Sequence, residues 1–568
     1  MRYIAVASDY DGTLASHGNV GETALAALER LRGSGRRLVL VTGRELGDML
    51  AAFPHVELFD RVVAENGGLL YTPSLREERA LGEAPPAPLV AELRRRGVEP
   101  LSVGRVIVAT WEPHETAVLE VIHTPGLEHQ VIFNKGAVMV LPPGINKASG
   151  LRAALADLGL SPHNAVGVGD AENDHAFLAL CEASVAVANA LPLVQERADL
   201  VTDARDGEGV AELADALLAD DLAPLAPKLN RHHILLGTRD DGEEAQVAPF
   251  GSNLLIAGPS SSGKSTLVRG LLERLTDAGY QFCLIDPEGD YEGFEIGARL
   301  GDSQRAPTVE EVTALLADPV ANAVVDLLGL ALEDRPGFCE ALLPRLAELR
   351  ARTGRPHFVV VDEAHHLLPQ GRDPGALGIR AESGGLVFVT VHPANVARTA
   401  LSCVDVAIAI GASPDATLNG LAEALGRPKP AGVPTELESG EAVAWCNGET
   451  PFRFTIAPTR SETRRHRRKY AEGNLGEDRS FVFRGQDGKL NLRARNLFQF
   501  LDLGDGVDEE TWLHHLHQRD YSAWFAHGVK DDALAEDAAA VEERNDVTAG
   551  ESRSLIRQAI ESRYTAPA

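Results

Sequence analysis

The chain has 568 residues, of which 44% are apolar and 5% aromatic, and its formal net charge is −29. This length exceeds one ordinary hydrophobic core, so we expect three or more domains. The negative charge argues against a broad surface that coats nucleic acid. No apolar run of about eighteen residues and no secretory signal occurs, so we expect no membrane association.

The five cysteines are scattered along the chain, and no two of them have C-x-x-C spacing. Zinc sites and disulfide frameworks need cysteines at short or regular spacings. The pattern therefore predicts a reduced, cytoplasmic protein with neither a zinc site nor disulfides.

Strand and helix patterns alternate from the start of the chain. Residues 3–8 (YIAVAS) and 36–44 (RRLVLVTGR) are typical of buried strands, and residues 21–35 (GETALAALERLRGSG) have apolar side chains at helical spacing. Residues 164–178 (NAVGVGDAENDHAFL) repeat the strand-to-helix pattern. Such alternation predicts an α/β domain with a parallel sheet, whose sites lie at the carboxyl ends of the strands.

Carboxylates follow two of these strands. Asp9 and Asp11 end the first strand, and Asp170 and Asp174 follow the later one. Clustered carboxylates repel one another and lose hydration, and a Mg²⁺ ion with hard oxygen ligands removes that penalty. We therefore expect a magnesium site formed by Asp9 and Asp170, with Asp174 as a further candidate ligand.

The same positions suit phosphoryl transfer. Asp9 can attack phosphorus as a nucleophile and form an aspartyl-phosphate, and Asp11 can protonate the leaving oxygen and then activate water. Thr42, at the end of the second strand, and Lys147, at a helix start, can hold the phosphoryl oxygens.

The segments DYDGTL, VTGR, NGG, NK and GDAEND resemble the haloacid-dehalogenase (HAD) phosphatases, specifically their Cof-like, subfamily IIB branch. The resemblance covers residues 1–220 and implies a Rossmannoid domain with a small cap inserted at about 84–143. It implies Asp9 as nucleophile, Asp11 as acid/base, and Mg²⁺ held by Asp9, the Asp11 carbonyl and Asp170, with Asn173 and Asp174 completing the site. A cap that closes over the site favours a small phosphorylated substrate.

The strand pattern restarts after a Pro-rich linker at 221–229. A strand, a small-residue loop and a helix cover NLLIAGPSSSGKSTLVRGLLERL, and Gly258 and Gly263-Lys264-Ser265 match the P-loop. Backbone N–H groups of such a loop cradle phosphates at a helix N-terminus. We expect Lys264 to bridge phosphate oxygens and Ser265 to bind the Mg²⁺ ion. Thr266, the next residue, is expected to contact the nucleotide.

Two later strands end in polar residues. Residues 357–369 (HFVVVDEAHHLLP) bring Asp362 and Glu363, and GLVFVTVHP ends near His392. Asp362 would lie behind the magnesium, Glu363 would orient the attacking water, and His392 would sense the terminal phosphate. A hydrogen-bonded structural role for His392 is an equal alternative.

Residues 230–457 resemble the HerA/FtsK-type ATPases, on the P-loop, FCLIDPEGDY, VVVDEAHHLLP and TALSCVDVAIAI. The resemblance implies a RecA-like α/β domain that binds and hydrolyses ATP. It also implies a homo-oligomer, commonly a hexamer, with an arginine donated in trans. Arg380 fits that role, and Arg372 and Arg398 compete for it. Nucleic acid remains an open partner.

Residues 458–568 begin with the basic run RRHRRK at 464–469, which we interpret as a linker that could also bind phosphates. Trp512, Trp524 and their neighbours have the spacing of packed helices, so we expect a mainly helical region. His514, His515 and His517 are expected on a solvated helix face.

We therefore expect a two-enzyme chain, a phosphohydrolase fused to an ATPase. A polynucleotide kinase–phosphatase is the enzyme alternative, although a cap would exclude a polymer and Glu363 suits water activation. A nucleotide-dependent assembly scaffold is the non-enzymatic alternative.

Overall fold

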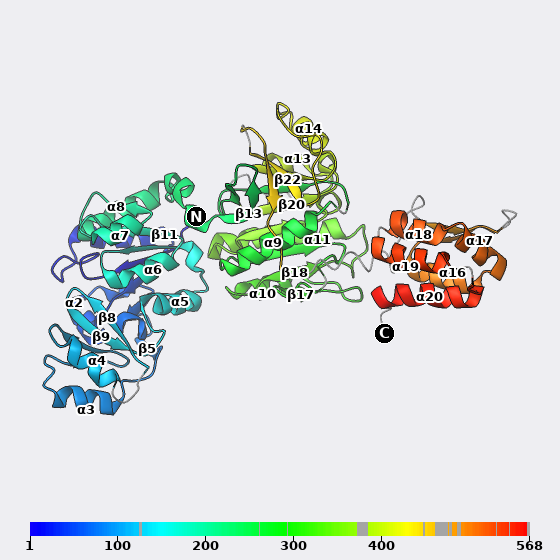
Figure 1. Cartoon of the computed structure of the whole chain (residues 1–568). Coiled ribbons are helices and arrows are strands. Elements are labelled where there is room, and N and C mark those ends of the chain that lie inside the picture. The colour runs from blue at the N-terminus through cyan, green and yellow to red at the C-terminus, as the bar shows by residue number, and fades with distance from the viewer. Residues whose placement is uncertain are drawn as a thin grey trace. The chain divides into compact units, whose positions relative to one another are not determined.

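The computed structural model describes residues 1–123, 128–260, 262–291, 293–371, 384–446, 449–460, 475, 480–485, 490–529, 531–544 and 546–564. The chain divides into two compact units, Met1–Ser461 and Glu462–Ala568. The first unit contains three separate sheets, and the second contains a strand pair and helices (Figure 1). None of the described helices combines the length and hydropathy of a membrane-spanning segment.

The first sheet has eight strands, and its parallel part carries the first predicted site. In spatial order the strands are β12 (Leu200–Val201), β11 (Ala183–Ala186), β10 (Ala165–Gly169), β1 (Ala5–Asp9), β2 (Arg37–Val41), β3 (Arg61–Ala64), β4 (Leu69–Thr72) and β5 (Glu77–Ala80). Neighbours from β12 to β3 are parallel, and β4 and β5 are antiparallel additions. The α/β domain with a parallel sheet that the strand–helix alternation predicted is thus observed.

Six helices accompany this sheet: α1 (Glu22–Gly33), α2 (Leu46–Ala52), α5 (Lys147–Asp157), α6 (His175–Leu180), α7 (Pro192–Arg197) and α8 (Asp206–Asp220). In α1 the buried residues are Ala24, Ala27, Leu28 and Leu31. This spacing puts them on one face of the helix, which packs against α8 and the sheet core. The alternation of apolar strands and one-sided helices therefore accounts for this layer arrangement.

A small antiparallel domain is inserted between β5 and α5. Its strand order is β6 (Ser102–Val103), β7 (Val108–Trp111), β9 (Ala137–Leu141) and β8 (Gln130–Asn134), and its helices are α3 (Ala87–Arg95) and α4 (Glu115–His123). The helices and the sheet share a separate hydrophobic cluster that includes Leu93, Val118 and Val140. We call this inserted domain the cap.

The third sheet has eleven strands. In spatial order they are β14 (Glu244–Val247), β13 (Ile234–Arg239), β23 (Phe452–Ile456), β22 (Glu441–Cys446), β21 (Val406–Ile410), β15 (Leu254–Ala257), β20 (Leu386–Thr390), β19 (Phe358–Val361), β16 (Phe282–Asp286), β18 (Ala323–Asp326) and β17 (Ala298–Leu300). Neighbours from β21 to β17 are parallel, whereas β22, β23, β13 and β14 pair antiparallel.

Helices cover both faces of this sheet. They are α9 (Lys264–Asp277), α10 (Val309–Ala317), α11 (Arg335–Thr353), α12 (Ala364–Leu367), α13 (Arg398–Ser402) and α14 (Pro414–Leu425) (Figure 1). Successive residues of β16 belong to different clusters: Leu284 packs with α9 residues, and Cys283 and Ile285 pack with α10 and α11 residues. Because side chains alternate across a strand, continuous apolar runs are required where both faces are covered.

The second unit is mainly helical. It contains the pair β24 (Phe481–Phe483) and β25 (Leu492–Ala494), helices α16 (Leu497–Gly506), α17 (Glu509–His517), α18 (Asp520–Trp524), α19 (Asp532–Glu542) and α20 (Ala549–Arg563), and a π-helical turn at Phe525–Val529. The expectation of three solvated histidines is wrong for His515, which is buried. Its Nδ1 lies 2.7 Å from Oδ2 of Asp520, and its Nε2 accepts the N–H of Arg484.

Candidate active site

Three carboxylates meet at one edge of the first sheet. Asp9 is the last residue of β1, Asp170 follows β10, and these two strands are parallel neighbours. One carboxylate oxygen from each of Asp9, Asp170 and Asp174 lies within 4.8 Å of the others, and all three residues are buried. Parallel strands bring their carboxyl ends to the same edge, so the topology itself assembles the group.

The Lys147 ammonium joins two of these carboxylates. Lys147 begins α5, and its Nζ lies 2.6 Å from Oδ1 of Asp9 and 2.6 Å from Oδ1 of Asp174. Burial disfavours the charged ammonium, but the carboxylates of Asp174 and Asp9 outweigh that effect and raise the pKa of Lys147. The cation is therefore retained beside Asp9.

Negative charge still exceeds positive charge in the buried group. Burial, together with the charge of Asp174, raises the pKa of Asp9 to about 7, although Lys147 opposes this shift. Oδ2 of Asp174 is already used, because it accepts the N–H groups of Asp170 and Ala171 at 2.8 Å and 2.9 Å. Buried carboxylate oxygens in excess fit a hard divalent cation such as Mg²⁺.

The cap reaches the same group. Lys135 lies in the turn between β8 and β9, and its Nζ is 2.6 Å from Oδ2 of Asp170 and 3.3 Å from the carbonyl oxygen of Asp11. Gly12 makes this approach possible: its φ is +87°, and a Cβ there would lie 2.5 Å from Oδ2 of Asp170. The sequence analysis missed Lys135, for which an Asn-Lys-Gly turn was the one available sign.

The Asp11 side chain lies apart from the three carboxylates. Its Oδ2 accepts Nε–H of Arg44 at 2.7 Å, its Oδ1 accepts Nη2–H of Arg44 at 2.6 Å, and the side chain is 45% exposed. Thr42 directly follows β2, is buried, and its Oγ1 accepts the N–H of Arg44 at 3.2 Å. The backbone carbonyl oxygen of Asp11, rather than its carboxylate, therefore shares Lys135 with Asp170.

Glu65 connects the sheet to the cap. Its buried carboxylate accepts three successive backbone N–H groups, from residues 105, 106 and 107, at 3.0, 2.7 and 3.2 Å. The neighbouring Asn66 accepts Nδ2–H of Asn173 at 3.0 Å, which ties this turn to the residues after β10. The sequence analysis quoted the NGG motif but did not single out Glu65.

The predicted nucleotide loop joins β15 to α9. Gly258 follows β15, Gly263 has a φ of +105°, and α9 begins at Lys264. Nζ of Lys264 donates to the carbonyl oxygens of Gly258 and Pro259, both at 2.9 Å, and burial lowers its pKa. Ser265 and Thr266 lie in the first turn of α9.

The other predicted residues of this site lie at neighbouring strand ends. Asp362 and Glu363 follow β19, and His392 follows β20, which lies between β19 and β15. Burial and the adjacent Glu363 raise the pKa of Asp362 well above its usual range. Oε2 of Glu363 lies 3.3 Å from Nδ1 of His365, a residue that sequence reasoning did not select.

Asp286 organises the loop after β16. Its Oδ1 accepts the N–H groups of residues 288, 289 and 290, and its Oδ2 accepts the N–H of Tyr291 at 3.0 Å. Burial raises its pKa to about 7. This carboxylate explains locally why the stretch DPEGDY forms a tight loop at the sheet edge.

The predicted trans-acting arginines fall in different places. Arg398 begins α13, whereas Arg380, Arg372 and the basic run at 464–469 lie outside the residues that the structure describes.

Comparison with known proteins identifies the class of the N-terminal module, residues 1–220, which contains the first sheet and the cap. The sequence profile of the haloacid dehalogenase-like hydrolases matches residues 6–81 and 121–213. A phosphoglycolate phosphatase of Methanothermobacter thermautotrophicus is 34% identical over 224 residues, which span 37% of this chain and 96% of that protein. The phosphoglycolate phosphatase of Haloarcula marismortui is 33% identical over 36% of this chain and 92% of that protein. The chain belongs to the haloacid dehalogenase-like hydrolase family.

Solved structures include a haloacid dehalogenase-like hydrolase from Bacteroides thetaiotaomicron, with 21% identity and a TM-score of 0.34. The match covers 38% of this chain and 99% of that protein.

Proposed function

We propose that the chain combines a Mg²⁺-dependent phosphomonoesterase, acting through an aspartyl-phosphate on Asp9, with an ATP-hydrolysing module at 230–457. The observation that supports the first part most strongly is the buried Lys147 ammonium, 2.6 Å from both Asp9 and Asp174 at the edge where Asp170 also lies. A buried ammonium held beside the nucleophile can stabilise the negative charge of the phosphoryl group during its transfer.

In the first step a carboxylate oxygen of Asp9 attacks phosphorus and the phosphorus–ester oxygen bond breaks. The Asp11 carboxyl gives its proton to the leaving oxygen, and Lys147 and Thr42 hold the phosphoryl oxygens. For this step the Asp11 side chain, which is 45% exposed, would leave Arg44 and turn toward the substrate.

In the second step Asp11 accepts a proton from water, whose oxygen attacks phosphorus and releases inorganic phosphate and free Asp9. A Mg²⁺ ion held by Asp9, the Asp11 carbonyl, Asp170 and Asp174 would neutralise the charge of the phosphoryl group.

We infer a small substrate with a second anionic group, in the class of phosphoglycolate. The Lys135 side chain is 45% exposed at the cap turn, and its Nζ lies 2.6 Å from Oδ2 of Asp170. The relatives named phosphoglycolate phosphatases, at 34% and 33% identity, support the same substrate class. A carboxylate on the substrate would pair with Lys135 while its phosphate faces Asp9.

The test compares phosphoglycolate with p-nitrophenyl phosphate, which lacks a carboxylate. Asp9→Asn is expected to abolish hydrolysis of both. Lys135→Ala is expected to lower kcat/KM for phosphoglycolate by roughly 10- to 100-fold, the value of one charge-assisted hydrogen bond, with little effect on p-nitrophenyl phosphate. Arg94→Ala, which removes an exposed cation of the cap, is the matched control. Equal losses on both substrates would contradict the assigned role of Lys135.

For the second part, Lys264 at the start of α9 and Asp362-Glu363 at the end of β19 support nucleotide binding and water activation. The carboxylates of Glu363 and Asp362 favour the charged form of Lys264, so these groups act on one another electrostatically. ATP with Mg²⁺ at Ser265 is the proposed ligand, in a HerA/FtsK-like, RecA-like domain.

Glu363→Gln separates this proposal from its alternatives. Loss of ATP hydrolysis with retained ATP binding supports the ATPase. Transfer of labelled phosphate from ATP to a 5′-hydroxyl end would favour the polynucleotide kinase–phosphatase, and absence of turnover in the parent protein would favour the scaffold. Assays with duplex and single-stranded DNA across salt concentrations, together with the solution mass, test nucleic-acid and oligomer partners.

A further inference from the structure

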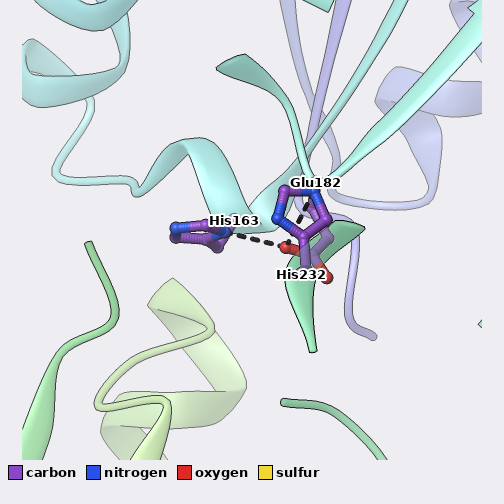
Figure 2. A group of neighbouring side chains, drawn as sticks. All are labelled: His163, Glu182 and His232. Carbon is purple, nitrogen blue, oxygen red and sulfur yellow. Dashed lines mark hydrogen bonds and ion pairs between the residues drawn. The ribbon is translucent and has the colours of Figure 1, made fainter. Parts of the chain in front are cut away.

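A second group of ionisable side chains lies at the opposite edge of the first sheet. His163 belongs to the turn Pro162–Asn164 that precedes β10, and Glu182 directly precedes β11. His232 ends the turn Asn230–His232 (Figure 2). Because these residues lie at the amino ends of the strands, the group is separate from Asp9 and Asp170 at the carboxyl ends.

The hydrogen bonds of His163 leave one ring nitrogen directed at a carboxylate. Its Nε2 lies 2.7 Å from the carbonyl oxygen of Ala278, and its Nδ1 lies 2.8 Å from Oε2 of Glu182. A carbonyl oxygen only accepts, so Nε2 carries the proton. In the neutral ring, the Nδ1 lone pair then faces a carboxylate lone pair, and either a second proton or a metal ion must lie between them.

The same ring geometry is typical of histidines that bind metals. Such a histidine donates its other N–H to a carbonyl or carboxylate, which fixes the tautomer and the ring orientation. The His163 ring is also stacked on Tyr280, with 3.8 Å between ring centroids. The lone pair of Nδ1 is therefore held in one direction before any ligand arrives.

His232 supplies a second nitrogen. Its Nε2 is buried and has no hydrogen-bond partner within the described part of the chain, and it lies 3.8 Å from Oε2 of Glu182. A neutral imidazole can offer this nitrogen to a metal ion as a ligand. A buried nitrogen without a partner is costly and calls for an explanation.

Glu182 supplies the anionic oxygen. Its side chain is fully buried; Oε1 accepts Nη2–H of Arg2 at 2.7 Å, and Oε2 accepts the hydroxyl of Tyr280 at 2.8 Å. These contacts hold the carboxylate in place while Oε2 faces both imidazoles. One ligand atom from each of His163, Glu182 and His232 lies within 4.8 Å of the others.

We propose that His163, Glu182 and His232 form a binding site for a divalent metal ion of the zinc class. Two imidazoles and one carboxylate suit zinc and its neighbours, whereas magnesium and calcium prefer oxygen ligands alone. The absence of paired cysteines does not bear on such a site, because its ligands come from three distant segments. The ion would link the turn at 230–232 to the strands β10 and β11.

The experiment uses the full chain, stripped with a chelator and dialysed against zinc, with excess magnesium added to compete with zinc at the acidic group around Asp9. Bound zinc is then counted by elemental analysis. His232→Ala and the milder His232→Gln are each expected to bind one zinc ion per chain fewer than the wild type. His233→Ala, at the adjacent histidine, is the matched control and should bind as the wild type does.

X-ray absorption of the zinc-loaded wild type gives a readout that needs no variant. Scattering from two imidazoles in the zinc shell supports the site. A shell made of oxygen alone, or equal zinc content in the wild type and both His232 variants, would overturn the proposal. It would then leave a protonated His163 paired with Glu182 as the explanation of the 2.8 Å contact.

Discussion

Replacing Lys147 with methionine removes the cation between Asp9 and Asp174 and nearly preserves side-chain length. Lys147 is 2% exposed, and its Nζ lies 2.6 Å from each carboxylate. Removing one partner of a buried ion pair costs about 3–5 kcal/mol, because the remaining charge is left buried without compensation. Protonation of Asp9, whose pKa is already raised to about 7, limits the loss, so we take the lower value.

A loss of about 3 kcal/mol corresponds to a decrease in melting temperature of roughly 6–12 °C for a domain of about 200 residues. The assay is thermal unfolding of the full chain in chelator, followed by circular dichroism, with attention to the transition of the N-terminal module. Arg152→Met, at an exposed position of the same helix α5, is the control and should leave this transition unchanged.

Excess Mg²⁺ should narrow the difference between Lys147→Met and the wild type, because the ion supplies positive charge to the same carboxylates. If the variant melts within about 2 °C of the wild type in chelator, the two carboxylates are not held as charged partners of Lys147 and the reasoning fails.

Three other predictions concern separate parts of the first unit. Asp9→Asn should eliminate phosphomonoester hydrolysis and leave ATP binding intact; loss of both would show that the two sites are not independent. Lys264→Ala should weaken ATP binding by about 1.4–3 kcal/mol, roughly 10- to 150-fold by calorimetry, without changing phosphomonoesterase activity; unaltered ATP affinity would contradict the P-loop assignment. Glu65→Ala leaves three backbone N–H groups at 105–107 without their acceptor, so it should raise KM for phosphoglycolate and speed proteolysis of the cap junction; Glu77→Ala is the exposed control.

The carboxylate group could be predicted from the sequence because its members follow the carboxyl ends of strands in a strand–helix repeat. Asp9 and Asp170 each end an apolar strand of a strand–helix repeat, and parallel strands place such residues at one edge. Lys147 was predictable for the same reason, since it begins the helix that follows the cap. Local sequence motifs are sufficient to predict a site where the fold brings the carboxyl ends of their strands together.

Lys135 and Glu65 were not predictable in the same way. The position of Lys135 depends on how the cap docks over the sheet, which no local pattern encodes. Glu65 is a buried acid whose partners are backbone N–H groups, and any residue type can provide such a group. The sequence therefore gives no sign of the contact. The Asp11 carboxylate was expected to face the phosphoryl group, but it pairs with Arg44 instead. This pairing is a tertiary contact that the sequence pattern does not indicate.

The two edges of the first sheet treat buried acids in opposite ways. At the carboxyl edge three carboxylates lie together and Lys147 contacts two of them; burial and the charge of Asp174 raise the pKa of Asp9. At the amino edge a single carboxylate, Glu182, accepts hydrogen bonds from Arg2 and Tyr280 and lies 2.8 Å from Nδ1 of His163. The first arrangement gains from a hard cation that adds charge. In the second group the charge of Glu182 is already compensated by Arg2, so an ion there must be bound by the imidazole nitrogens. We therefore expect the two ends of this sheet to prefer different ions, magnesium beside Asp9 and zinc beside Glu182.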